Sequence, residues 1–297
     1  MERQYSLPAA PAAPAASAVP AAPAAYAAPA GRHPAAALLA LALAGVAGNV
    51  AAAPLVELVA GLAEPRQVEY ELVRRDGSVP VVFENGLAAK LGQWEKVFRA
   101  VSQERSAFAY NRPGYGKSAQ VVSARDGEHI VEELRALLRS KGLNPPYILV
   151  GHSVGGLYSQ LYARRHPDEV KALVLVDSTH PQQFLGVGAY EQWPTLVRTS
   201  FKLLSSSIEM SEFKAATATG EQVLALPAPA GVRVMVLSAA RPLGERSAYA
   251  DDANAKRKDI VRLYPGAQLQ WVDSGPDIPL ERPEAVLAAI RAVAAGR

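Results

Sequence analysis

The residues best suited to chemistry stand in the segment Gly151-His152-Ser153-Val154-Gly155. The apolar run Tyr147–Val150 precedes it, and a stretch rich in Leu, Tyr and Ala follows. This pattern predicts a strand, a sharp turn and a helix, because glycines two residues before and after a serine let strand and helix pass without a Cβ clash. The hydroxyl then stands at the carboxyl end of a sheet, where ligands bind in open α/β folds. We therefore predict that Ser153 is a nucleophile.

Strand-like and helix-like segments alternate around this serine. Strands are expected at 68–73, 79–84, 107–110, 147–150, 172–176, 232–237 and 269–272, and helices at 94–101, 130–138, 154–165 and 283–293. The turn Arg75-Asp76-Gly77 predicts that the first two strands form a β-hairpin. The alternation as a whole predicts an α/β fold with a mostly parallel, doubly wound sheet. Helical, proline-containing sequence at 180–230 interrupts the alternation.

Composition excludes several other kinds of site. The chain has no cysteine, which excludes a thiol nucleophile, a disulfide scaffold and cysteine-ligated zinc. Its five histidines lack the His-Glu-x-x-His spacing, so no metal site is predicted. The net charge of +3 is small and scattered, which argues against a nucleic-acid partner.

Five segments, in the same order, resemble motifs of the α/β-hydrolase superfamily, in particular its small serine esterase and lipase-like branch. They are the serine segment and residues 81–87, 110–118, 173–181 and 273–283. The likeness runs from about Gln67 to Val293. It implies an α/β-hydrolase fold with a helical cap at about 180–230, hydrolysis of a small or acyl ester through an acyl-enzyme, and no cofactor. Five cap residues either line an apolar acyl pocket or only pack the cap on the core: Phe184, Tyr190, Trp193, Leu196 and Phe201.

The same resemblance assigns the oxyanion hole and the acid. Two backbone N–H groups, those of Leu87 and Val154, match the family's oxyanion donors. Asp177, which directly ends the 172–176 strand, is the favoured acid. Glu245 is the alternative, because it lies in the loop after the next strand, where many family members carry Asp.

The general base is missing from its usual place. The family's histidine follows the last strand in a Ser-Gly-His setting, and this chain reads Ser274-Gly275-Pro276. Proline accepts no proton, so Pro276 is predicted to fill the position of the expected histidine and to leave activity low or absent. His180 is the one alternative base that we expect to face the site, from the root of the cap.

Three functions stay open at this point. The chain is a serine hydrolase with a displaced base, a non-catalytic protein that binds a small-molecule ligand in the same pocket, or a hydrolase carrying one inactivating change. Fold alone does not choose among them.

The first fifth of the chain differs in composition from the remainder. Residues 1–34 are rich in Ala and Pro, which predicts a disordered arm. Residues 35–63 form an apolar segment, uncharged from 35 to 56, which predicts a membrane anchor or an export signal, with a packed helix of a cytoplasmic protein as the alternative. The hydrolase domain is then expected to span 64–297.

Overall fold

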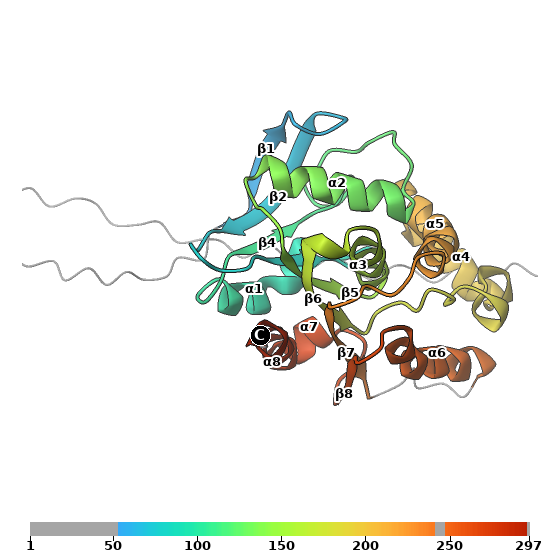
Figure 1. The fold of residues 1–297 in the computed structure, drawn as a ribbon. Coiled ribbons are helices and arrows are strands. Elements are labelled where there is room, and N and C mark those ends of the chain that lie inside the picture. Colours follow the sequence, from blue (N-terminus) through green and yellow to red (C-terminus); the bar gives the residue numbers. More distant parts are fainter. Residues whose placement is uncertain (1–52, 241–246, 296–297) are drawn as a thin grey trace, which may run out of the picture. The chain divides into compact units, whose positions relative to one another are not determined.

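The computed structural model describes residues 53–240 and 247–295, which belong to one compact unit that runs from Asn49 to Arg297. Its eight strands form a single sheet in the order β1-β2-β4-β3-β5-β6-β7-β8 (Figure 1). They are β1 (Leu55–Val59), β2 (Arg66–Val73), β3 (Val81–Glu84), β4 (Ala107–Tyr110), β5 (Tyr147–His152), β6 (Val170–Val176), β7 (Arg233–Ala239) and β8 (Gln268–Val272). The α-helices are α1 (Glu95–Val101), α2 (Gly127–Ser140), α3 (Val154–Arg165), α4 (Thr195–Leu204), α5 (Ser207–Leu224), α6 (Ala248–Asp259), α7 (Ile278–Glu281) and α8 (Pro283–Ala295).

The sheet is parallel from β4 through β8 and antiparallel at β1 and β2. This confirms the predicted mostly parallel sheet. The central strands are buried along their whole length, and β3, β4 and β5 have no exposed residue. Apolar runs of this kind are typical of parallel strands with helices on both faces.

The hairpin predicted at Arg75-Asp76-Gly77 is wrong. β2 pairs with β1 and β4, whereas β3 pairs with β4 and β5. β4 is fully buried and lies between the two strands that the turn connects. The local turn signal was present, but the apolar β4 competes for the same edge of β3 and displaces β2 from it.

Alternate residues of the strands supply two hydrophobic cores. Val82, Leu149 and Leu173 face helices α2 and α3, and their sequence neighbours face helices α1 and α8 on the other side of the sheet (Figure 1). Burial of both faces fixes the register, because a slip of one residue would exchange the two sets of side chains.

The predicted cap corresponds to an insertion between β6 and β7 that carries α4 and α5. A capping box at Ser206 and Glu209 begins α5, which packs against α2 and α3. The insertion is therefore joined to the core by its second helix.

Residues 1–52 lie outside the described part of the chain, and with them the predicted arm and most of the predicted apolar segment. The described remainder of that segment includes β1, which pairs with β2. The domain boundary predicted at residue 64 thus lies inside a hairpin, and the sheet already begins at Leu55. Among the described residues, no helix is long and apolar enough to cross a membrane.

Candidate active site

Ser153 lies between β5 and α3, as its sequence setting predicted. Its backbone has φ 51° and ψ −124°, a conformation that L residues rarely adopt. A Cβ on Gly151 would lie 2.5 Å from the carbonyl oxygen of Gly155, and a Cβ on Gly155 would lie 2.3 Å from that of Asn85. The glycine spacing therefore serves the turn itself, and the prediction of a strained strand-to-helix turn at Ser153 is confirmed.

A pocket of about 390 Å³ opens over this serine. Its walls come from the loops after the strands, from the insertion and from α6, at the carboxyl edge of the sheet where open α/β folds bind ligands. The lining residues are Gly86, Leu87, Ala89, Gln93, His152, Ser153, Asp177, Ser178, Thr179, Gln183, Phe184, Tyr249, Ala253, Arg257, Pro276 and Asp277. Four of the five predicted site residues line it, and the fifth, Val154, begins the helix beside them.

The two predicted oxyanion donors are available. The Leu87 N–H follows β3, and the Val154 N–H opens α3, next to the serine. Within the described part of the chain neither amide has a hydrogen-bond partner. Unpaired amides stabilise a developing negative charge, and the position of Val154 at a helix start adds to this effect.

Arg112 holds the loop that presents Leu87. Its Nη1 donates to the carbonyl oxygen of Asn85 at 2.7 Å, and its Nη2 donates to that of Gly86 at 3.0 Å. The Asn85 side chain is buried, donating to the Tyr110 carbonyl and accepting from the Trp94 indole. Because two of its carbonyl groups and the Asn85 side chain are hydrogen-bonded, this loop is held in place.

The same arginine is wholly buried between two carboxylates. Glu84 ends β3 and lies 2.7 Å from Arg112, and Glu212, on α5, lies 2.9 Å from it. Burial raises the pKa of Glu84, and the neighbouring Arg112 opposes this shift. Because Glu212 belongs to the inserted segment, Arg112 connects the insertion with the oxyanion loop.

Asp177 directly follows β6 and has φ 39°, again in the left-handed region. Both of its oxygens accept from Arg257 of α6, from Nε and from Nη2, each at 3.0 Å. Its Oδ1 also accepts the Ala239 N–H at 3.1 Å. The carboxylate predicted as the acid is thus hydrogen-bonded to a cation.

His152 lines the pocket, but both of its ring nitrogens are engaged. Nε2 lies 3.0 Å from the carbonyl oxygen of Pro276, which can only accept, so Nε2 carries the proton. Nδ1 then accepts from the Gln93 amide at 2.6 Å. Burial lowers the pKa of His152, which keeps the ring neutral. No lone pair of this ring is left to take a proton from Ser153.

The predicted alternative base, His180, lies elsewhere, and so do two other histidines. His180 is buried outside the pocket, with Nδ1 accepting the Gln182 N–H and Nε2 3.3 Å from Asp259. His129 and His166 pair with carboxylates of α2 and its cap. Glu245, the alternative acid, lies outside the described residues. Within the described chain, Pro276 stands in the pocket wall and no second histidine replaces it.

Of the two alternatives for the five cap residues, packing within the insertion holds for three. Tyr190, Trp193 and Phe201 contact one another and Phe213, with ring centroids 4.7 to 6.3 Å apart. Leu196 is 78% exposed, and only Phe184 of the five lines the pocket.

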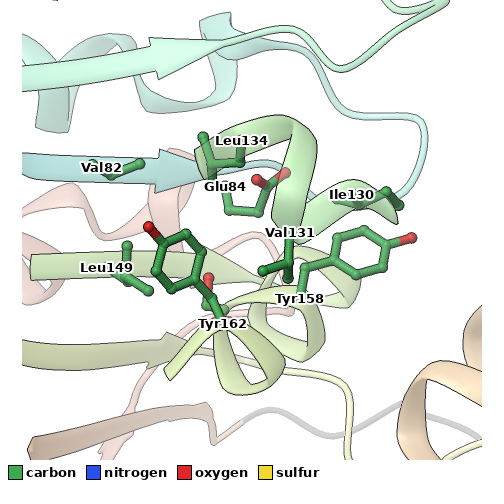
Figure 2. Close-up of a pocket in the computed structure, with 9 residues that line it drawn as sticks. Val82, Glu84, Ile130, Val131, Leu134, Leu149, Tyr158 and Tyr162 are labelled. Atoms are coloured by element: carbon green, nitrogen blue, oxygen red, sulfur yellow. The ribbon is translucent and has the colours of Figure 1, made fainter. Parts of the chain in front are cut away.

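A second, much smaller cavity lies between α2, α3 and the sheet. Figure 2 shows Glu84, Ile130 and Tyr158 around it. Its volume of about 10 Å³ holds at most one water molecule. The pocket over Ser153 is thus the one of the two with room for an organic ligand.

Sequence reasoning missed Arg257 and Gln93. Neither stands in a motif, and each reaches the site from a helical segment far along the chain. One signal was available, because a buried strand-end aspartate needs a cationic or hydrogen-bonding partner. That need did not identify which of the many arginines supplies it.

Part of the chain is similar in sequence to known proteins. Residues 79–209 match a family model described as the alpha/beta hydrolase fold. The uncharacterized protein YbdG of Bacillus subtilis is 33% identical over 101 residues, or 34% of this chain and 31% of that one. A (lyso)-N-acylphosphatidylethanolamine lipase of Bos taurus is 32% identical over 102 residues, 33% of this chain and 30% of that one. The chain thus spans about a third of the length of these curated relatives.

Solved structures extend the likeness over most of the chain. An epoxide hydrolase from metagenomes of hot environments superposes with a TM-score of 0.61 at 16% identity, covering 82% of this chain and 99% of that one. A carboxylesterase of the thaumarchaeon Nitrososphaera gives a TM-score of 0.57 at 16% identity, covering 80% and 97%. With its strand order, its serine turn and these matches, the chain has the α/β-hydrolase fold.

Proposed function

We propose that this protein is a carboxylesterase-like or lipase-like hydrolase in which Ser153 attacks the carbonyl carbon of an acyl ester bound in the 390 Å³ pocket. The observation that carries the proposal is that the pocket holds a serine on a strained turn and the Leu87 amide, and that the Val154 amide adjoins the serine, neither amide having a partner in the described chain. The Leu87 and Val154 amides would stabilise the oxyanion that forms. The alcohol then leaves, and water releases the acyl group from the serine.

Removal of the proton from the Ser153 hydroxyl limits the rate of this reaction. Neither nitrogen of His152 has a free lone pair, and Pro276 occupies the wall where the base is expected. The serine proton must then pass to water in the pocket. Without a complete triad, only substrate binding and the oxyanion hole contribute to catalysis, and the reaction is slow.

The ion pair of Asp177 and Arg257 favours a second function. A carboxylate that accepts two hydrogen bonds from an arginine is less available to orient a histidine, so the same pocket suits a protein that holds an ester or related small molecule without turnover. This pseudoenzyme function needs the pocket but not the reactivity of Ser153.

A fluorophosphonate probe separates the two functions. We expect slow, stoichiometric labelling at Ser153, identified by peptide mass spectrometry, together with weak hydrolysis of p-nitrophenyl butyrate that Ser153→Ala abolishes. No labelling after prolonged exposure, with hydrolysis equal in the wild type and in Ser153→Ala, would exclude the hydrolase and leave the binding function.

A further inference from the structure

The α4 helix of the insertion turns an aliphatic face toward solvent. Leu196, Leu203 and Leu204 are 78%, 78% and 86% exposed, and Val197 is 49% exposed. Elsewhere in the described chain, large aliphatic residues more than 70% exposed are limited to Val122, and β1 carries a less exposed group of Leu55, Val56 and Leu58. Four on one ten-residue helix are unusual for a surface that only meets water.

The spacing places these four side chains together. At 3.6 residues per turn they fall within an arc of about 120° on the helix. Phe201 lies outside this arc and packs inward on Phe213, with ring centroids 4.7 Å apart. The helix is therefore held by its aromatic side, and its aliphatic side contacts nothing within the described protein that would bury it. We define this surface, Leu196, Val197, Leu203 and Leu204, as the α4 face.

Charge on the helix indicates what the α4 face meets. The ten residues of α4 include Arg198 and Lys202 and no acidic residue. Lys202 is exposed, whereas Arg198 is half-buried. At 3.6 residues per turn both basic residues fall on the side of the helix opposite the aliphatic residues. A short helix with an aliphatic side and a basic polar side has the composition of segments that lie in the headgroup layer of an anionic bilayer.

Size argues against a second copy of the chain as the occupant. A stable dimer buries about 800 Å² on each partner. A ten-residue helix is only about 15 Å long, so four aliphatic side chains on it supply a small part of that area. Binding to a bilayer needs a smaller buried area, because a few side chains inserted at the acyl boundary already contribute to binding.

We propose that the α4 face docks on a lipid surface with anionic headgroups. The insertion that carries it also places Phe184 in the wall of the Ser153 pocket, so docking would hold the pocket near the membrane. The proposal concerns binding only, and it stands whether or not Ser153 is reactive.

The absence of cysteine from the chain permits a direct test. Full-length Leu204→Cys is labelled with an environment-sensitive nitrobenzoxadiazole dye and mixed with phosphatidylcholine vesicles with or without phosphatidylglycerol. We expect a blue shift and a rise in intensity on the vesicles that contain phosphatidylglycerol. Val122→Cys, whose side chain is 98% exposed away from α4, is the matched control and should not respond.

Co-sedimentation of the full chain with the same vesicles gives an independent readout. The double variant Leu203→Ser, Leu204→Ser should bind at least about tenfold more weakly, since it removes two inserting side chains. The control Leu58→Ser, Val122→Ser removes exposed aliphatics elsewhere and should bind as the wild type does. Three results would overturn the proposal: a silent dye at residue 204 while the protein sediments, equal binding of the two double variants, or a dye response to protein concentration without vesicles, which indicates self-association.

Discussion

Arg257 approaches Asp177 through two parallel hydrogen bonds, Nε to Oδ1 and Nη2 to Oδ2, each 3.0 Å long. Both side chains line the pocket over Ser153 and are largely buried, with 14% and 5% of their surfaces exposed. The pair therefore competes for the carboxylate that a catalytic histidine would need.

A restored histidine should have its full effect on the rate only when Arg257 is removed. We expect Pro276→His to raise p-nitrophenyl butyrate hydrolysis, and Pro276→His with Arg257→Leu to raise it by roughly a further tenfold or more, because Asp177 is then free to orient the new imidazole. Initial rates of the four proteins, wild type, both single variants and the double variant, measure the effect.

Ser153→Ala in the double variant is the control and should return the rate to background. If the double variant folds, by circular dichroism, and remains inert, the pocket does not bind esters productively and the hydrolase proposal fails.

Gly155→Ala should destabilise the protein strongly. Its Cβ would lie 2.3 Å from the Asn85 carbonyl oxygen and 2.4 Å from that of Glu84, both backbone atoms that cannot move without shifting β3. We expect a loss of about 3 kcal/mol in the free energy of unfolding, or no folded protein. Urea unfolding measures it. Gly92→Ala, whose Cβ meets nothing within 4 Å, should stay within about 1 kcal/mol of the wild type, and equal losses would refute the steric argument.

Arg112→Met should cost about 3 to 5 kcal/mol of stability. It leaves the buried carboxylates of Glu84 and Glu212 without their shared cation. The exposed pair of Arg99 and Glu95 provides the comparison, and Arg99→Met should cost less than about 1 kcal/mol. Guanidinium unfolding of both variants tests the difference. Similar losses in the free energy of unfolding for the two variants would mean that the buried network does not stabilise the fold more than an exposed ion pair does.

Stability should depend on pH through Glu169. Its hydrogen bonds from Arg135, with a further one from Tyr162, lower the pKa of Glu169 from 4.5 to about 2. A lowered pKa stabilises the fold fully above pH 4.5, and this contribution is lost as the pH falls toward 2. Because the group is partly exposed, we expect Glu169→Gln to cost about 1 kcal/mol at neutral pH.

The pH series supplies its own control. The difference between wild type and Glu169→Gln in thermal unfolding should shrink as the pH falls below 4.5. A difference that stays constant from pH 7 to pH 3 would point to packing rather than charge.

The sequence by itself determined the features that depend on neighbours along the chain. Glycines two residues on either side of Ser153 predicted the turn, because the Cβ clash that they avoid is local. Fully apolar runs predicted buried parallel strands in the same way. The position of Asp177 at a strand end followed from the length of one such run.

Only the tertiary structure decided the relations between distant residues. Arg257 is 80 residues from Asp177, and the two groups that fix the proton on His152 are 59 and 124 residues from it. The pairing of β2 with β4 rather than β3 likewise depended on which strand entered between them. The type of a side chain indicates that it needs a partner but does not identify that partner. The partner is determined when the whole sheet and its helices pack.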